Sequence, residues 1–147
     1  MSFSEFRRQR GSAAIEFVLV FGIFLSALLA MIDFSRWLFA INSAHEAAGE
    51  GARVAVVCNF DAAAIEQHMA PYLATAKGGS VSKSYVASPG GTCTAGDTSG
   101  CASITVSLSG YYIDSIAPFL PIALTLPTAK TFLSRESMDS TLNPRCV

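Results

Sequence analysis

Two histidines and four cysteines are the side chains in this 147-residue sequence that most readily do chemistry. His45 and Glu46 form an H-E pair, but Gly49 stands where a zinc-binding H-E-x-x-H helix needs its second histidine. His68 is isolated, and a single histidine is more often a packing or surface residue than a ligand. The sequence contains no G-x-S-x-G elbow, phosphate-binding loop or C-x-x-C pair. We therefore predict a non-enzymatic protein with no cofactor and no metal.

The cysteines are better suited to disulfides than to metal binding. All four, Cys58, Cys93, Cys101 and Cys146, follow a long apolar run, and an even number on one side of a membrane indicates an oxidising compartment. Four cysteines permit three pairings. The chain between Cys93 and Cys101 is rich in Gly, Ser and Thr, so we favour a local bridge there, with Cys58 paired to Cys146. Free or intermolecular thiols are the alternative.

The apolar run itself, residues 12–32, has 21 residues and one charge, Glu16. At about 1.5 Å per residue, a helix of this length spans a hydrocarbon core of about 30 Å. Three arginines precede it, Arg7, Arg8 and Arg10, so the positive-inside rule predicts a cytoplasmic N-terminus and an outer C-terminal domain. A secretory signal peptide is the rival interpretation, but the run is too long and no small-x-small cleavage site closes it.

A carboxylate at the head of a membrane segment has a cost, about 2.5–3.5 kcal/mol at a helix centre and less near an interface. In the simpler interpretation, Glu16 lies at the cytoplasmic boundary and has no special role. In the sharper one, a peptidase cuts after Gly11 and gives Ser12 a free, positively charged amine. That amine would lie about one helical turn from Glu16, in the same chain or a neighbour, and would offset part of the burial cost.

The stretch G-SAAIEF resembles the G-x-x-x-x-E-[FY] processing site of type IV pilin-like proteins, and residues 11–57 are similar to the TadE-like pseudopilins of the tight-adherence (Flp) pilus system. The small-residue stretch EAAGEGARVAV is part of this likeness, as is the basic-acidic pair Arg135-Glu136 near the end. The resemblance implies that Gly11 precedes the cut, that Ser12 becomes the N-terminus, and that Glu16 and Phe17 are the recognition pair.

The same resemblance implies a minor pilin-like component of a pilus assembly system, which acts through helix packing in the membrane and an outer interaction domain. Its partners would be a prepilin peptidase, other pseudopilins, the major pilin and the inner-membrane assembly platform. The chain would be a single-pass inner-membrane protein with a periplasmic domain, and could enter a pilus. The alternative is an uncleaved membrane-anchored envelope protein whose outer domain binds another secreted protein.

The elements that would position these groups begin with a helix that continues to about residue 57, because no proline interrupts it. Asp33/Arg36 and Glu50/Arg53 can pair at i, i+3 along it. Its outer part is rich in small side chains, which allow a helix or sheet to approach closely. A break near Gly49 is the alternative. Three aromatic residues beside the apolar run predict an interfacial belt: Phe34, Trp37 and Phe39.

Beyond residue 57 the pattern predicts a small α+β domain. A helix capped by Asp61 follows, is kinked or divided by Pro71 and is closed by Gly78-Gly79. Strands at 81–87 and 104–109 pair antiparallel, the second with Ile104, Val106 and Leu108 on a buried face and its polar residues on a wet one. A short helix before Pro118 and an edge strand at 123–131 follow.

Composition sets the outer limits. The chain is 51% hydrophobic and 14% charged, with a net charge of −1, and it has no basic cluster interleaved with aromatics, so nucleic-acid binding is excluded. We predict a basic leader at 1–11, a long transmembrane helix at 12–57 and a periplasmic domain at 58–147. The fold class is α+β: a long N-terminal helix, then a disulfide-stapled domain whose antiparallel sheet packs on helix.

Overall fold

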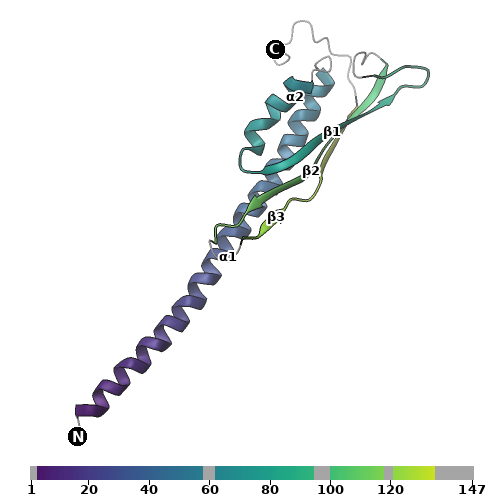
Figure 1. The fold of residues 1–147 in the computed structure, drawn as a ribbon. Helices are drawn as coiled ribbons and strands as arrows, with labels where there is room; N and C mark the ends of the chain where they lie inside the picture. The colour runs from purple at the N-terminus through teal and green to yellow at the C-terminus, as the bar shows by residue number, and fades with distance from the viewer. Residues whose placement is uncertain (1–2, 58–61, 95–99, 118–120, 135–147) are drawn as a thin grey trace.

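The computed structural model describes residues 3–57, 62–94, 100–117 and 121–134, and shows a long rod whose C-terminal end carries a small sheet domain (Figure 1). The predicted α+β class is therefore confirmed. In chain order the elements are α1 (Phe3–Val57), α2 (Ala62–Met69), the 3-10 helix η1 (Ala70–Leu73), β1 (Lys77–Ala87), β2 (Cys101–Asp114), β3 (Ala123–Thr125) and β4 (Ala129–Ser134).

The rod is α1, a single helix of 55 residues and so about 80 Å long. It runs to Val57 without the break considered near Gly49, and it begins at Phe3, so the predicted leader continues the helical backbone. Both expected ion pairs form along it: Arg36 Nη1 lies 3.3 Å from Asp33 Oδ1, and Arg53 Nη1 lies 3.6 Å from Glu50 Oε2.

The sheet is antiparallel, with β2 at its centre. β1 pairs along one edge of β2, and the other edge is shared by β4 at residues 103–108 and β3 at residues 112–114. The predicted hairpin between the two long strands is confirmed. So is the local disulfide near its tip, since Cys93 is bonded to Cys101 with their Cα atoms 4.9 Å apart. Cys58 and Cys146 lie outside the described residues, as does the pair Arg135-Glu136.

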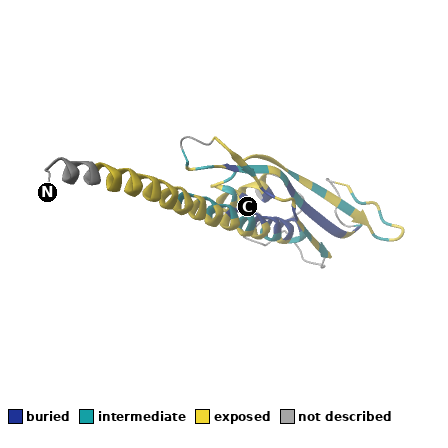
Figure 2. Ribbon diagram, turned by 90° about the horizontal axis from the view of Figure 1, so that it is seen from below, coloured by how far each residue is buried: buried dark blue, intermediate teal, exposed yellow. Residues whose placement is uncertain are grey.

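The core forms where the outer third of α1 lies against the sheet and α2 (Figure 2). The helix contributes almost only alanines to this contact, and the sheet contributes larger aliphatic side chains. Because alanine adds so little width, the backbones of α1 and β2 approach closely, as the small-residue stretch predicted. The fully or nearly fully buried residues include Ala44, Ala47, Ala48, Ala52, Ala55, Ile104, Val106 and Leu108.

One face of β2 is less exposed to solvent than the alternation of apolar and polar residues predicted. Ile104, Val106 and Leu108 are buried as expected, but Thr105, on the opposite face, is only 9% exposed. The reason is its central position: Thr105 lies between Ser84 on β1 and Phe132 on β4, which cover it from both sides. Alternation along one strand identifies the faces but not how neighbouring strands shield them.

The second helix is shorter than predicted. Pro71 does divide it, since α2 ends at Met69 and Pro71 lies in the first turn of η1. Gly78 and Gly79 do not close a helix, however; both belong to β1 and have positive φ, 67° and 77°. At Gly79 an added Cβ would lie 2.4 Å from the ring of Tyr111, so glycine here allows a close cross-strand contact. The proposed cap, Asp61, lies outside the described residues.

The C-terminal part also differs from expectation. A short helix before Pro118 is wrong, because residues 111–114 complete β2 and are followed by a bend at Ile116. The cross-strand pairing of Tyr112 and Ile113 with β3 explains why these residues extend rather than coil. The edge strand predicted at 123–131 forms as two strands, β3 and β4, and Pro127 lies between them.

Two glycines in α1 provide a matched test of the packing between α1 and α2. An added Cβ at Gly49 meets nothing within 4 Å, whereas at Gly51 it would lie 2.5 Å from Sδ of the fully buried Met69. We expect Gly49→Ala to stabilise the fold by up to about 1 kcal/mol through helix propensity. Gly51→Ala should show no gain or a net loss, measured by denaturant unfolding in detergent. An equal gain at both sites would contradict tight packing of Met69 on Gly51.

The disulfide at the hairpin tip gives a second prediction. Replacing Cys93 and Cys101 together by alanine should destabilise the domain by about 2.5 kcal/mol, the loop-closure estimate for a short loop. Unfolding can be followed by the fluorescence of Trp37, the one tryptophan in the sequence, which contacts β3. An unchanged unfolding midpoint would show that the hairpin is held by its strand pairing alone.

Candidate functional site

The residues predicted to be processed all lie on the far half of α1, well away from the sheet domain. Gly11, Ser12, Glu16 and Phe17 are exposed there, and none of the described side chains lies within 4 Å of a Cβ placed on Gly11. Ser12 and Glu16 are four residues apart in one continuous helix and so share a face, as the amine–carboxylate pairing requires. Phe17 stacks on Phe21, with ring centroids 5.8 Å apart. Processing itself stays a prediction.

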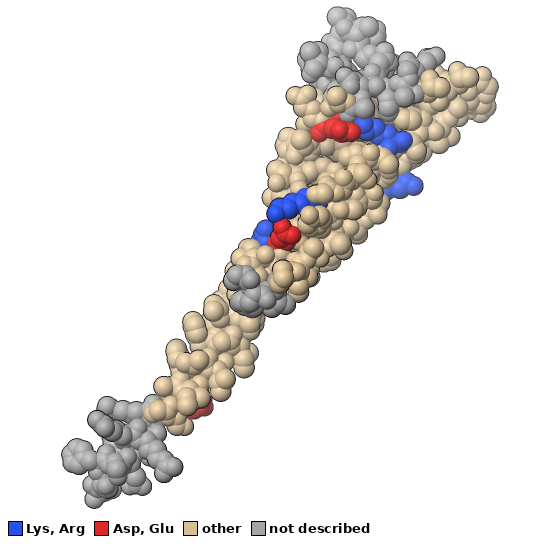
Figure 3. Space-filling model, viewed as in Figure 1, with Lys and Arg blue, Asp and Glu red and all other residues tan. Residues whose placement is uncertain are grey.

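The middle of α1 is apolar on every side. Among the described residues, α1 is the one helix long and apolar enough to cross a membrane, and no residue of its most apolar stretch is buried. In Figure 3 the visible face of the rod is nearly free of charge, whereas basic and acidic side chains lie on the sheet domain. A helix that is apolar all round and is not covered by its own chain fits a membrane anchor.

Where the rod meets the sheet domain, α1 and the lower ends of β2 and β3 make a compact set of polar contacts, which we call the junction. It comprises Asp33, Arg36 and Trp37 on α1, Asp114 and Ser115 at the end of β2, and Thr125 on β3. Trp37 Nε1 donates to the carbonyl of Thr125 at 3.0 Å, and Arg36 Nη1 donates to the carbonyl of Asp114 at 3.2 Å. The sheet is thereby fixed to the helix directly above the apolar run.

Asp33 is the centre of the junction. Its carboxylate accepts hydrogen bonds from the hydroxyl of Ser115, from the backbone N–H of Ile116 at 3.0 Å, and from Arg36 at 3.3 Å. The bonds from Ser115 and Ile116, with the nearby Arg36 charge, lower the pKa of Asp33 below its usual 3.8. A second ion pair, between Lys77 Nζ and Asp114 Oδ2 at 2.6 Å, ties β1 to the same end of β2.

The predicted aromatic belt is only partly free to meet an interface. Trp37 is half-buried and bonded to β3, so its polar edge is used by the protein itself. Phe34 and Phe39 are largely exposed, and Phe34 lies against Trp37 with ring centroids 6.0 Å apart.

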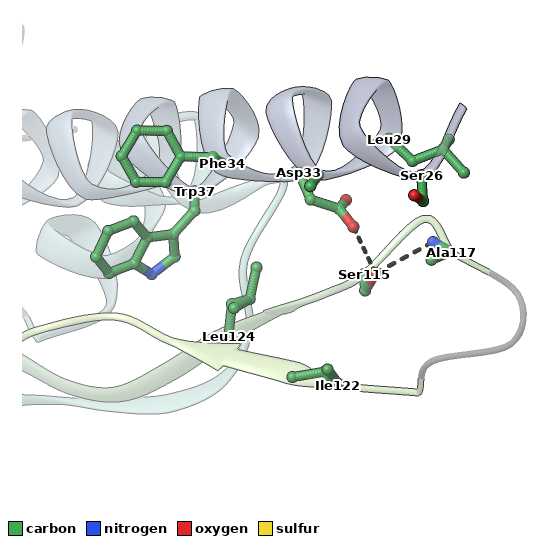
Figure 4. Close-up of a pocket in the computed structure, with 10 residues that line it drawn as sticks. Ser26, Leu29, Asp33, Phe34, Trp37, Ser115, Ala117, Ile122 and Leu124 are labelled. Atoms are coloured by element: carbon green, nitrogen blue, oxygen red, sulfur yellow. Dashed lines mark hydrogen bonds between the residues drawn. The ribbon is translucent and has the colours of Figure 1, made fainter. Parts of the chain in front are cut away.

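An apolar pocket of about 430 Å³ lies beside the junction, between α1 and the connection from β2 to β3. In Figure 4, Asp33 points from α1 toward Ser115, and Leu124 points from β3 toward the helix. The pocket is lined by Ser26, Leu29, Ala30, Asp33, Phe34, Trp37, Ser115, Ala117, Ile122 and Leu124. Its size is in the range of small-molecule sites, but it offers few polar groups to orient a ligand.

The described residues bring together no group of three or more His, Cys, Asp or Glu side chains that could hold a metal. His45 is exposed on α1 and His68 lies on α2. Sequence reasoning missed the junction and the pocket, because it treated Asp33 only as a partner of Arg36 and Trp37 only as a belt residue. A carboxylate immediately after an apolar run was the signal available, since such a group needs partners at the edge of a membrane.

Comparison with known proteins supports the resemblance over the N-terminal part of the chain. The family model described as TadE-like protein matches residues 11–53. This match covers less than a third of the chain, includes all four predicted processing residues and ends within the alanine-rich part of α1. No curated protein and no solved structure matches the sequence.

Acid should weaken the junction through Asp33. Because its pKa is lower in the folded protein than in the unfolded one, the carboxylate adds stability above about pH 4 that is lost as pH falls through the folded pKa. We expect Asp33→Asn to be less stable than the natural protein at pH 7, with the difference shrinking as the pH falls below about 4. Thermal unfolding across this pH range measures it, with Glu46→Gln at an exposed site of α1 as control. A difference independent of pH would contradict the role of the carboxylate charge.

Proposed function

We propose that this protein, whose residues 11–53 match the TadE-like family, is a minor pilin-like component of a tight-adherence pilus assembly system. The family match over the apolar helix is the observation that carries the proposal. The fold supports it, because a continuous helix of 55 residues presents an uncovered apolar surface below and a small interaction domain above. The role is structural rather than enzymatic.

The mechanism is helix packing in the membrane. The apolar part of α1 lies beside the equivalent helices of other pseudopilins and of the major pilin. Glu16 sets their register, because its carboxylate pairs with the free amine of Ser12 in the same chain or a neighbour once the leader has been removed. An ion pair of this kind is worth most where water is scarce, and a shift of one residue would separate its partners.

The partners follow from this mechanism. A prepilin peptidase cuts between Gly11 and Ser12 and recognises Glu16 with Phe17, and an inner-membrane assembly platform receives the processed helix. The N-terminus lies in the cytoplasm and the sheet domain in the periplasm, consistent with Arg7, Arg8 and Arg10 before the apolar run and with the disulfide of the outer domain.

Processing provides the first test. The full chain is co-expressed with its cognate prepilin peptidase and extracted from membranes, and its N-terminus is read by intact mass and sequencing. We expect a new N-terminus at Ser12 in the natural chain and none in Gly11→Leu. Gly22→Leu is the matched control, because Gly22 lies on the same helix, an added Cβ there also meets nothing within 4 Å, and processing should continue.

A chain that keeps Met1 through Gly11 in the presence of active peptidase would contradict processing and favour an uncleaved envelope anchor whose outer domain binds a secreted protein. Glu16→Ala separates the two roles of the carboxylate. If the variant is cut but no longer co-purifies with the other pseudopilins, Glu16 acts in assembly. If it is cut and co-purifies normally, the register role is wrong and Glu16 is a boundary carboxylate.

A further inference from the structure

If α1 crosses a bilayer at its apolar run, the pocket beside the junction straddles the outer limit of the hydrocarbon. The hydrocarbon would then begin after Arg10, the last of the three arginines, and end near Asp33. Along the straight helix, Ser26 and Ala30 are about 21 and 27 Å beyond Ser12, within a core of about 30 Å. Both residues line the pocket, so Ala117 and Ile122, which line it from the opposite side, would reach the bilayer as well.

The described backbone that directly follows β2, residues 115–117, is bonded as a lipid environment requires. Three successive N–H groups leave the regular ladder of β2, and each has an acceptor within the protein. Ser115 N–H donates to the carbonyl of Ile122 at 3.1 Å, Ile116 N–H to Asp33 at 3.0 Å, and Ala117 N–H to the hydroxyl of Ser115 at 3.1 Å. In water, an exposed N–H group of a loop can donate to solvent instead. In the hydrocarbon of a membrane, each N–H group without an acceptor costs several kcal/mol of stability.

The side chains at the same level point to the same surroundings. Ile116 and Ile122 are each 48% exposed and Phe34 is 57% exposed, all beside a pocket whose wall is almost wholly apolar. Exposing large apolar side chains on both sides of the polar contacts of Asp33 would be unfavourable in water. The same arrangement suits the boundary between hydrocarbon and headgroups.

We propose that this pocket receives an acyl chain of a phospholipid from the leaflet on the side of the sheet domain, so that the domain is seated in the membrane surface and not held above it. Bilayer hydrocarbon surrounds any membrane-spanning helix at this depth, so acyl chains are present there at high concentration. The inference rests on α1 crossing a membrane, as the proposed function does, but it does not depend on processing or on pilus assembly.

Trp37 is a built-in probe, since it lines the pocket and is the single tryptophan of the chain. The full-length protein is reconstituted into phosphatidylcholine vesicles with or without dibrominated acyl chains, which quench nearby indoles. We expect brominated vesicles to reduce Trp37 fluorescence at least twofold, while acrylamide in the water has little effect. Ala30→Phe, which fills the pocket from the helix, should at least halve the bromine quenching.

Ala27→Phe is the matched control, because Ala27 is an exposed alanine one turn from Ala30 but does not line the pocket. Its quenching should equal that of the natural chain. Equal quenching in the two variants would overturn the proposal, since Trp37 would then meet lipid outside the pocket. Quenching by acrylamide alone would place water there, and quenching by neither agent would place protein there, such as a second copy; both results also overturn it.

Two further measurements distinguish a misfolded variant from a wrong pocket assignment, and a wrong pocket assignment from a missing membrane anchor. Thermal unfolding of both variants shows whether the added ring disturbs the fold, and a variant with a lowered midpoint is replaced by Ala30→Leu against Ala27→Leu. Flotation of the natural chain with vesicles reports the anchor itself. A chain that does not float defeats this inference and the proposed function together, whereas one that floats without bromine quenching defeats the pocket alone.

Discussion

The fold depends on one steric constraint: the outer third of α1 must be narrow on the face that meets the sheet. The buried residues of this part of α1 are alanines apart from Gly51 and Val54, and their small size allows β2 and β4 to lie close to the helix. Replacing one of these alanines with a larger aliphatic residue would push the sheet away from the helix. Overpacking of this kind lowers the stability of a core by about 1–3 kcal/mol. The α2 helix depends on the same narrowness, because Met69 lies over Gly51.

The two parts of α1 therefore suit different environments. Its lower part is apolar on all sides and contains no buried residue, as in lipid-facing helices, and its upper part is covered on one face by protein. The polar contacts between α1 and the residues that follow β2 are made at Asp33. Since the backbone never leaves the helix at this point, the sheet domain has no hinge on the rod within the described residues.

Local signals in the sequence were enough to predict the continuous helix, the hairpin of β1 and β2 and the disulfide between Cys93 and Cys101. Each of these depends on residues close together in the chain. The junction could not be predicted, because Asp33 and Ser115 are 82 residues apart and Trp37 and Thr125 are 88 apart. Gly78 and Gly79 were misjudged for a related reason: their role is set by the rings of Tyr111 and Tyr112 across the sheet.

The continuity of α1 through the junction has a mechanical consequence. A helix that slides along a neighbour by one residue advances about 1.5 Å and, to restore equivalent side-chain contacts, turns by about 100°. Because α1 continues unbroken into the sheet domain, the whole domain would translate and rotate together with the helix. The register of α1 against neighbouring helices in a membrane would therefore determine the direction in which the tip of the β1–β2 hairpin faces. A register error would turn the hairpin tip toward a different neighbouring subunit.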